Sequence, residues 1–355
     1  SQIWSPDGSK IAFVSYRGDR SFIGIYKDKN SNINWINPSF DRDSSPRWSP
    51  DGSEIVYIRQ PGAAGKPASI LGGKHNPWKI VKTNIKSMVS RELWTAPKTL
   101  RGSYPRTQGG TNLHWASNRV VFLSYHDGWQ HLYSISENGG EALLLTPGDF
   151  MCEYIKLSPD KKSIVFTANT GDDNYDIDRR HIVQVSVDKS DMKVLTNGIG
   201  LEWTPLITGD LEHVAYISAT STRPPLPTIL DLGTNKEKIL AQDRIPQDFP
   251  SEKMVIPTQI KFKSTDGIQV YATKFEKNDN KKNKPAIIYI HGGPPRQMLL
   301  GWHYSSYYSN AYALNQYLAS KDFVVISVNY RLGIGYGYEF HNPIDGGTRG
   351  ASEYK

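Results

Sequence analysis

A turn rich in glycine and proline carries the strongest chemical signal in this sequence of 355 residues. The apolar run Ala286–Ile290 leads directly into His291, Gly292, Gly293 and two prolines. The run predicts a buried parallel strand, and open α/β sheets bind ligands where such strands end. Glycines at that edge let backbone N–H groups approach an anion closely. The segment therefore predicts a turn that stabilises negative charge.

The backbone of this turn is a candidate oxyanion hole, which holds the negative oxygen formed when a carbonyl carbon is attacked. In α/β-hydrolases a loop at this position supplies one N–H donor, and the residue after the nucleophile supplies another. Pro294 and Pro295 have no N–H. The donor is therefore expected to be Gly292 or Gly293, with Gly293 favoured, and His291 is expected to orient the loop. A mere tight turn is the alternative, because short glycine motifs have low specificity.

The nucleophile that such a turn would serve is not found in the sequence. On this fold a catalytic serine lies in Gly-x-Ser-x-Gly and is followed by Asp and then His, and no such pentapeptide occurs. Most of the nine histidines fall in expected strands or turns, and His303 and His341 are candidates only for lining a pocket. The chain as given is therefore expected to contain no Ser–His–Asp triad and to be inactive by itself.

Two acidic residues are candidates for binding the free amine of a peptide. Glu153 and Glu202 lie at similar offsets ahead of two predicted inner strands, which would line a channel. Buried carboxylates can hold an ammonium group through charge-assisted hydrogen bonds. An ordinary charge facing the channel is the favoured alternative for both residues.

No metal site or other cofactor is predicted. The acidic segment Gly171–Arg180 resembles a calcium loop, but a loop starting at Asp172 would need Gly where Ile177 stands and Glu where Val183 stands. We expect instead a loop between strands in which aspartates pair with arginines.

A repeated unit fills the first two-thirds of the sequence. It combines a Ser-Pro-Asp-Gly turn with an apolar strand, as in Trp4–Ser15 and Trp48–Arg59, and weaker copies follow. An aromatic residue ends each apolar strand, at intervals of about 44 to 65 residues, which is typical of β-propeller blades. These aromatic residues are Phe13, Tyr57, Phe122, Phe166 and Tyr216. Residues 1–250 are therefore predicted to form an incomplete β-propeller with about five visible blades, and the insertion 60–77 either a surface loop or a lid.

The remaining region, 251–355, alternates strands with a helix. Thr258–Phe275 predicts a hairpin around an Asp-Gly turn. After the strand Ala286–Ile290, a helix is expected over about 307–320, and a second buried strand over 323–329. This order predicts the N-terminal part of an α/β-hydrolase domain, without the part that would bear the nucleophile.

Taken together, these segments resemble the prolyl oligopeptidase family of serine peptidases, especially its dipeptidyl-peptidase and acylaminoacyl-peptidase branches. The resemblance rests on the order of "WSPDGSKIAF" repeats, "HGGPP", "VNYRLGIGYGYEF" and "RGASEY". It implies a propeller that screens access to an α/β-hydrolase site, short peptides as substrates, and an oxyanion donor at Gly293. The family's Asn-Tyr-Arg-Gly segment maps onto Asn329–Arg331, but Leu332 stands where the glycine usually is.

Composition argues against a nucleic-acid-binding, a disulfide-bonded or a membrane-spanning protein. The formal net charge of +7 comes from scattered Lys and Arg residues, so no nucleic-acid partner is expected. Cys152 is the single cysteine, which excludes an internal disulfide, and no apolar run approaches the ~18 residues of a membrane span. Assembly into a homo-oligomer is left open.

The ends of the sequence suggest a piece of a longer protein. The chain begins inside a repeat, without Met or a leader segment, so we expect truncation at both ends, and a cytoplasmic and a periplasmic or secreted location are both left open. If the downstream sequence held no nucleophile, the alternative function would be a non-catalytic propeller that binds peptides or proteins.

Overall fold

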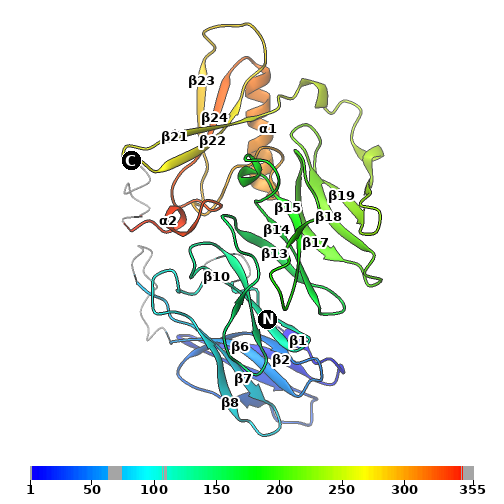
Figure 1. The fold of residues 1–355 in the computed structure, drawn as a ribbon, viewed down its shortest axis with the longest axis vertical. Coiled ribbons are helices and arrows are strands. Elements are labelled where there is room, and N and C mark those ends of the chain that lie inside the picture. Colours follow the sequence, from blue (N-terminus) through cyan, green and yellow to red (C-terminus); the bar gives the residue numbers. More distant parts are fainter. Residues whose placement is uncertain (1, 63–73, 106, 108–109, 345, 347–355) are drawn as a thin grey trace. The chain divides into compact units, whose positions relative to one another are not determined.

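The computed structural model describes residues 2–62, 74–105, 107, 110–344 and 346. Most of the insertion 60–77 and the whole of the final "RGASEY" lie outside these residues. The chain divides into two compact units, which Figure 1 shows coloured along the sequence. Unit 1 takes in 1–147, 161–163 and 186–191, and unit 2 takes in 148–160, 164–185 and 192–355.

Unit 1 is built mainly from antiparallel strands in groups of four. The first eight strands join into one sheet through a single parallel bridge between Ser21 and Arg42, and the next four form the sheet β12-β11-β10-β9. The strands are β1 (Gln2–Trp4), β2 (Ile11–Arg17), β3 (Arg20–Tyr26), β4 (Asn34–Ile36), β5 (Arg42–Trp48), β6 (Glu54–Gln60), β7 (Lys79–Asn84), β8 (Ser90–Thr95), β9 (His114–Ala116), β10 (Arg119–Ser124), β11 (His131–Ser136) and β12 (Leu143–Leu144).

Two further four-stranded sheets lie essentially in unit 2. Among the described residues, one short 3₁₀ helix lies between two strands of the first sheet and two more follow the second sheet. The sheets run in the orders β13-β14-β15-β16 and β17-β18-β19-β20. Their elements are β13 (Cys152–Leu157), β14 (Ser163–Ala168), η1 (Asp176–Asp178), β15 (His181–Ser186), β16 (Lys193–Val194), β17 (Leu201–Ile207), β18 (His213–Ala219), β19 (Leu226–Asp231), β20 (Glu237–Ile239), η2 (Gln242–Arg244) and η3 (Ser251–Lys253).

The repeated sequence unit corresponds to a repeated structural unit. Each of the five aromatic residues lies on the second strand of its group of four, on β2, β6, β10, β14 and β18. Ser-Pro-Asp-Gly turns precede β2 and β6, and in both a serine hydroxyl donates to the aspartate two residues on, at 2.6 Å from Ser5 to Asp7 and from Ser49 to Asp51. Gly8 and Gly52 adopt φ values of +69° and +72°, which explains the glycine that ends each turn.

The first strand of three groups contains the same irregularity. The pairing register shifts within β5, β13 and β17, and in each the shift begins next to a non-glycine residue with positive φ: Ser45, Tyr154 or Thr204. A bulge of this kind bends a strand and re-aims its side chains. The positive-φ residue directly follows Glu153 in β13 but lies two residues after Glu202 in β17, so both acidic candidates lie near a bulge without occupying equivalent positions.

The last part of unit 2 is a four-stranded sheet with a helix. The sheet has the order β21-β22-β24-β23, in which β24 pairs antiparallel with β22 and parallel with β23. The elements are β21 (Thr258–Lys263), β22 (Gln269–Phe275), β23 (Ala286–Ile290), α1 (Ser306–Ser320), β24 (Val324–Asn329) and α2 (Tyr338–His341). The predicted hairpin, parallel strand and helix are therefore confirmed.

The prediction that β23 is buried is wrong. Ile288 is 65% exposed and Ile290 is 69% exposed, whereas Tyr289 on the opposite face packs toward Tyr308 of α1. The strand lies at the edge of the sheet, and among the described residues only one of its faces is covered. Strand β24 is likewise buried on alternate residues rather than throughout.

The covered face contributes to the core of unit 2. Phe275 of β22, Val325 of β24 and Tyr312 of α1 belong to one buried cluster, together with Leu201 and Trp203 of β17. Burying large apolar side chains of this kind contributes roughly 1.5–3 kcal/mol each. This shared core fixes the α1 sheet against the β17–β20 sheet within unit 2.

Candidate functional site

The glycine turn begins where β23 ends. His291 is buried, whereas Gly292 and Gly293 are exposed. Within the part of the chain that the structure describes, the backbone N–H groups of these two glycines have no acceptor. Two adjacent, solvent-facing N–H groups at the end of a parallel strand are suitable for binding an anionic oxygen.

Gly293 occupies a backbone conformation that favours glycine. Its φ is +126°, and a Cβ atom at this position would lie 2.9 Å from Arg296 Cγ. Gly292 is less constrained, because a Cβ there would find only the Tyr308 hydroxyl, at 3.8 Å. Gly293, the donor favoured from the sequence, is thus also the position where the backbone conformation requires glycine.

Two tyrosines and His291 hold the carbonyl groups of the turn. Tyr308 of α1 donates its hydroxyl to Gly292 O at 2.5 Å, and Tyr330 donates to His291 O at 2.6 Å. The His291 ring stacks on Tyr330 with centroids 4.6 Å apart, and its Nδ1 lies 3.1 Å from Gly292 O. Burial lowers the pKa of His291, so the neutral ring donates from Nδ1. The carbonyl groups of the turn are thereby held, and its N–H groups are left open.

The chain behind the turn is fixed by amide side chains. Asn329, at the end of β24, accepts from Met298 N at 2.7 Å and donates to Met298 O at 3.0 Å. Gln297 is fully buried, and its Nε2 donates to Asp178 Oδ1 at 2.9 Å and to Ile177 O at 2.8 Å. Residues of η1 therefore hold the segment that follows the glycine turn.

Asp178 connects three segments of unit 2. Besides Gln297, its carboxylate accepts a hydrogen bond from Gln259 Nε2 of β21 at 2.5 Å and another from the Tyr336 hydroxyl. Burial raises the pKa of Asp178, and the three donors and Arg180 oppose this effect. No sequence feature indicated this residue beyond its place in an acidic run.

Glu153 is paired inside the protein. Arg180, whose side chain is fully buried, donates from Nε to Glu153 Oε2 at 2.6 Å, and Tyr304 donates to Glu153 Oε1 at 3.2 Å. The Glu153 side chain keeps 15% of its surface exposed. Arg180 also donates to Gln297 Oε1 at 2.8 Å, which links Glu153 to the segment behind the glycine turn.

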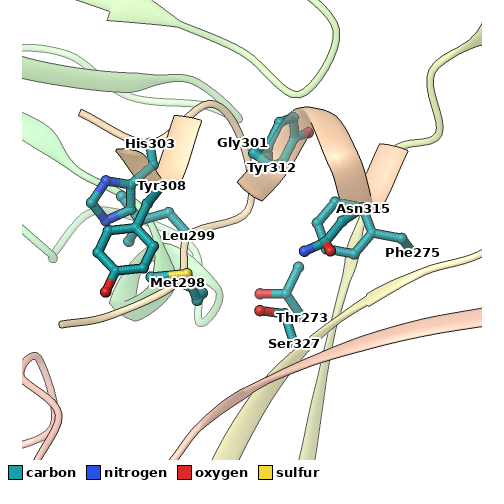
Figure 2. Close-up of a pocket in the computed structure, with 10 residues that line it drawn as sticks. All are labelled: Thr273, Phe275, Met298, Leu299, Gly301, His303, Tyr308, Tyr312, Asn315 and Ser327. Carbon is teal, nitrogen blue, oxygen red and sulfur yellow. The ribbon is translucent and has the colours of Figure 1, made fainter. Parts of the chain in front are cut away.

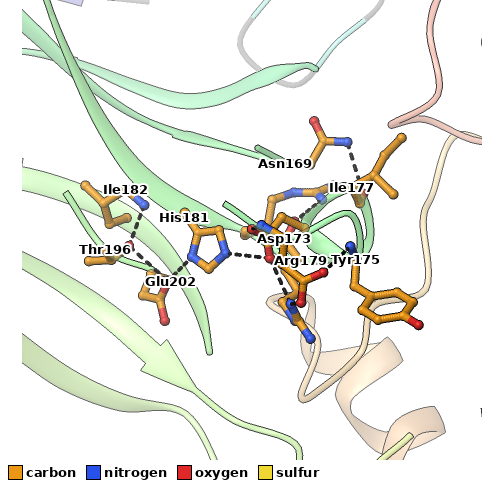
Figure 3. Close-up of polar contacts among 11 residues, drawn as sticks. Asn169, Asp173, Tyr175, Ile177, Arg179, His181, Ile182, Thr196 and Glu202 are labelled. Carbon is orange, nitrogen blue, oxygen red and sulfur yellow. Dashed lines mark hydrogen bonds and ion pairs between the residues drawn. The ribbon is translucent and has the colours of Figure 1, made fainter. Parts of the chain in front are cut away.

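Glu202 is also bound internally (Figure 3). Its Oε2 lies 2.9 Å from His181 Nδ1 and accepts a hydrogen bond from Thr196 Oγ1 at 3.0 Å. On the other side of the ring, His181 Nε2 faces Asp176 Oδ1 at 3.2 Å. Burial disfavours the charged ring, but the two carboxylates outweigh it and raise the pKa of His181 to about 9. The two acidic candidates therefore have separate basic partners.

The acidic segment 171–180 is a loop with aspartate–arginine pairs, as predicted (Figure 3). Arg179 Nη1 lies 3.0 Å from Asp173 Oδ2 and 2.8 Å from Asp176 Oδ1. Asp173 also accepts from Tyr175 N at 3.0 Å. Asp173 and Asp176 thus already have donors from the protein.

One exposed group of metal-ligating side chains occurs elsewhere. Asp210, Glu212 and His213 bring one ligand atom each within 4.8 Å of one another on the turn before β18. Asp210 Oδ1 already accepts from Glu212 N at 3.0 Å. Exposed acidic groups on a turn are not by themselves a metal site, and these are explained by the turn.

The two histidines proposed for pocket lining differ in setting. His303 lines a small cavity under α1, where its Nε2 lies 3.1 Å from Gln297 O and its Nδ1 accepts from Ser305 N at 2.8 Å. Burial lowers the pKa of His303 to about 3. The ring is therefore neutral, with its proton on Nε2. His341 is buried in α2 and lies outside that cavity.

Comparisons with known proteins bear on the family. The sequence profile of the dipeptidyl peptidase IV N-terminal region matches residues 80–225. The uncharacterized peptidase YuxL of Bacillus subtilis (strain 168) is 28% identical over 137 residues, which make up 37% of this chain and 19% of that protein. The resemblance to the prolyl oligopeptidase family is confirmed.

Solved structures of these peptidases share the fold. A puromycin-hydrolyzing peptidase of Mycobacterium tuberculosis matches with a TM-score of 0.70 and 17% identity, over 96% of this chain and 51% of that one. A structure from an analysis of two prolyl endopeptidases matches with a TM-score of 0.67 and 14% identity, over 96% of this chain and 48% of that one. The chain spans about half the length of these relatives. No helix among the described residues is long and apolar enough to cross a bilayer.

Proposed function

We propose that this chain is the β-propeller and the first part of the α/β-hydrolase domain of a serine peptidase that cleaves short peptides in the dipeptidyl- or acylaminoacyl-peptidase manner. The propeller would comprise residues 1–250 and the start of the peptidase domain residues 251–355. The observation that carries the proposal is the turn after β23, where Gly292 and Gly293 present N–H groups without acceptors among the described residues. The relatedness to peptidases supports the same reaction class.

The turn would act on the tetrahedral intermediate of peptide hydrolysis. When a serine attacks the peptide carbonyl, the carbonyl oxygen becomes an anion that needs hydrogen-bond donors already in place. The Gly293 N–H is the proposed donor, with Gly292 beside it, and one such donor is worth ~3–4 kcal/mol in the transition state. His291 would keep the Gly292 carbonyl turned away from the anion, so that only N–H groups face it.

We place the nucleophile, its histidine and its aspartate outside this chain. The sequence contains no Gly-x-Ser-x-Gly. In unit 1, Ser124 Oγ lies 2.8 Å from His126 Nδ1, but Ser124 is fully buried and the nearby Asp127 pairs with His131 at 2.6 Å. A serine without access to substrate cannot act as a nucleophile, so this pair is assigned a structural role.

A peptide substrate would also need a partner for its free amine if cleavage occurs near its N-terminus. Glu153 is the better of the two acidic candidates, because it retains exposed surface, whereas Glu202 is bound by His181 and Thr196. Arg180 would then hold Glu153 in place rather than compete for it. Because one carboxylate oxygen can accept more than one hydrogen bond, an ammonium group could join the existing pair.

The test uses this chain and its extension side by side. The chain as given is expected to hydrolyse no peptide substrate and to show no labelling with a fluorophosphonate probe, which reacts with activated serines. A longer gene product that includes Gly-x-Ser-x-Gly, Asp and His in that order is expected to label and to cleave. In that product Gly293→Ala should lower kcat about 100-fold or more through loss of the donor geometry, with Gly209→Ala on an exposed turn as the matched control. Labelling of the shorter chain would overturn the assignment.

A second candidate function is a non-catalytic propeller that binds peptides or proteins. The closely repeated four-stranded groups favour it, because they form a scaffold that does not itself require a nucleophile. The following gene sequence decides between the two: absence of the Ser, Asp and His order would leave only the binding module.

A further inference from the structure

A small cavity with a mainly apolar wall lies between helix α1 and the sheet (Figure 2). Its wall includes Thr273 of β22, Ser327 of β24 and Asn315 of α1, together with Phe275, Leu299 and Tyr312. The space that the centre of a water molecule can occupy there is about 10 Å³. A cavity that holds one water needs roughly 10–15 Å³ on this measure.

Three polar atoms on this wall have no hydrogen-bond partner among the described residues. They are Thr273 Oγ1, Ser327 Oγ and Asn315 Oδ1. Their residues are almost completely buried, with exposed fractions of 0%, 1% and 3%. A buried hydroxyl or amide without a partner is strongly unfavourable, and such groups in folded proteins are nearly always satisfied by protein atoms or ordered water.

The three atoms come from different elements but lie together. Thr273 and Ser327 are directly paired neighbours across β22 and β24, so their side chains leave the same face of the sheet. Figure 2 shows the Asn315 amide facing these two hydroxyl groups from the helix side. Although the hydroxyl groups are neighbours, they form no hydrogen bond with each other.

We propose that this cavity is a binding site for a single water molecule, which bridges Thr273, Ser327 and Asn315. The water would donate to Asn315 Oδ1 and to one hydroxyl oxygen, and would accept from the other hydroxyl. Buried waters typically make about three hydrogen bonds, so one water satisfies all three atoms at once. The water would then link β22, β24 and α1 by hydrogen bonds at a place where these three side chains form no hydrogen bond with one another.

The chemistry of the wall favours water over a metal ion. Calcium binds six to eight oxygen ligands, commonly including carboxylates, and magnesium needs an octahedral set. The cavity offers three neutral oxygens, and no Asp or Glu is among the ten residues that line it. The neutral ring of His303 on the same wall has both nitrogens engaged, so it adds no further ligand.

The direct test is a crystal structure of this chain at a resolution that shows ordered water. The expected result is one density peak within hydrogen-bond distance of all three oxygens, at about 2.7–3.2 Å. A peak with shorter distances that moves or strengthens when sodium is exchanged for rubidium would show a cation and overturn the proposal. Absence of any peak, with Asn315 or a hydroxyl turned to a protein partner, would also overturn it.

A second test measures the contribution of the site in solution. Each of Thr273→Val, Ser327→Ala and Asn315→Leu should lower the folding equilibrium constant about tenfold. Each removes one of the three hydrogen bonds that hold the proposed water, so the water is bound less tightly. The triple variant makes the cavity apolar and should lose much less than the product of the three single losses. Thr258→Val, at an exposed position of β21, is the matched control and should have little effect. Single variants that match this control, or strictly multiplicative losses, would contradict a shared water.

If Thr273→Val or Asn315→Leu fails to fold, a comparison of the wild-type chain with the milder variant Ser327→Ala still decides the question. Oxygen-17 magnetic relaxation detects water molecules that stay inside a protein for longer than bulk water does. The conservative single variant Ser327→Ala should lose one such long-lived water relative to wild type. An unchanged number of long-lived waters would count against the site.

Discussion

Arg180 donates a hydrogen bond of 2.8 Å to Gln297 Oε1, and the two residues are separated by 117 positions in the sequence. Arg180 follows η1 in the β13–β16 sheet, and Gln297 directly follows the segment that contains the glycine turn. The same guanidinium pairs with Glu153. Three segments that are distant in the sequence are therefore held by one cation.

Replacing this cation should strongly destabilise unit 2. Arg180→Met leaves Glu153 without its cation and Gln297 Oε1 without a donor, and loss of one partner of a buried ion pair typically costs about 3–5 kcal/mol. The free energy of unfolding, measured by urea denaturation, should fall by that amount. Arg20→Met removes an arginine whose side chain is 36% exposed, and serves as the control with a loss below about 1 kcal/mol.

A double variant separates the ion pair from packing. Adding Glu153→Gln to Arg180→Met removes the unpaired charge and should recover part of the lost stability. If the double variant were as unstable as the sum of both single variants, Arg180 would act through packing alone.

Stability should fall as the pH rises past neutrality, because of His181. The folded protein raises the pKa of this ring from 6.5 to about 9, so between these values the folded state binds more protons than the unfolded state. The contribution is fully present below pH 6.5 and is lost as the pH rises through 9. Urea titrations from pH 6 to 9.5 should show the decline, and His181→Gln should flatten it.

The pKa of His303 shifts in the opposite direction from that of His181, so the two residues affect stability on opposite sides of pH 6.5. The pKa of His303 is lowered to about 3, so its contribution is present above pH 6.5 and is lost as the pH falls toward 3. His303→Gln should therefore change the profile on the acid side and leave the decline above pH 6.5 intact. A profile above pH 6.5 that is the same with and without His181 would refute its assigned pKa.

At position 332 glycine should stabilise the protein more than alanine does, although alanine is normally the more stabilising of the two. Leu332 occupies the place where the family has glycine, and its φ is +75°. A left-handed backbone costs a non-glycine residue roughly 1–2 kcal/mol. Leu332→Gly should therefore be more stable than Leu332→Ala by about 1 kcal/mol, as measured by thermal unfolding. The alanine variant controls for loss of the side chain, and the reverse order would show that the backbone relaxes there.

The Tyr308 hydroxyl should stabilise the glycine turn measurably. Tyr308→Phe removes the hydrogen bond to Gly292 O and should cost about 1 kcal/mol of unfolding free energy. Tyr317→Phe, on the same helix and 58% exposed, is the matched control and should be neutral. Hydrogen exchange at the Arg296 amide, which donates to Pro294 O at 2.6 Å within the same turn, should accelerate only in the first variant. Equal exchange rates in the two variants would mean that Tyr308 does not hold the turn.

Local patterns predicted most of the elements that position the turn. The Asp-Gly signal located the hairpin of β21 and β22, and the apolar period located α1 to within one residue of its start. The neighbouring prolines left Gly292 and Gly293 as the possible donors, and the favoured residue, Gly293, is the one with a positive φ. These features depend on residues close together in the chain, so the sequence contains the information.

Contacts between distant segments could not be predicted in the same way. Nothing near Gln297 indicates that it meets Arg180 and Asp178, because that meeting depends on how a loop of one sheet packs on another. The exposure of Ile288 was missed for a related reason: an apolar run indicates a strand, but the position of the strand in its sheet decides which faces are covered. Leu332 was noted as a departure from the family, yet its positive φ required the structure.

Strand β23 has a further consequence for handling the protein. Its outer edge pairs with no other strand among the described residues, and Ile288 and Ile290 make one face of that edge apolar. Backbone groups in such a row can accept an extra strand from any extended chain, including a second copy of this one. Protein concentration, rather than temperature, should then decide how long a preparation of this chain stays monodisperse. The substitution Ile288→Lys would place a charge on that edge and should reduce the pairing.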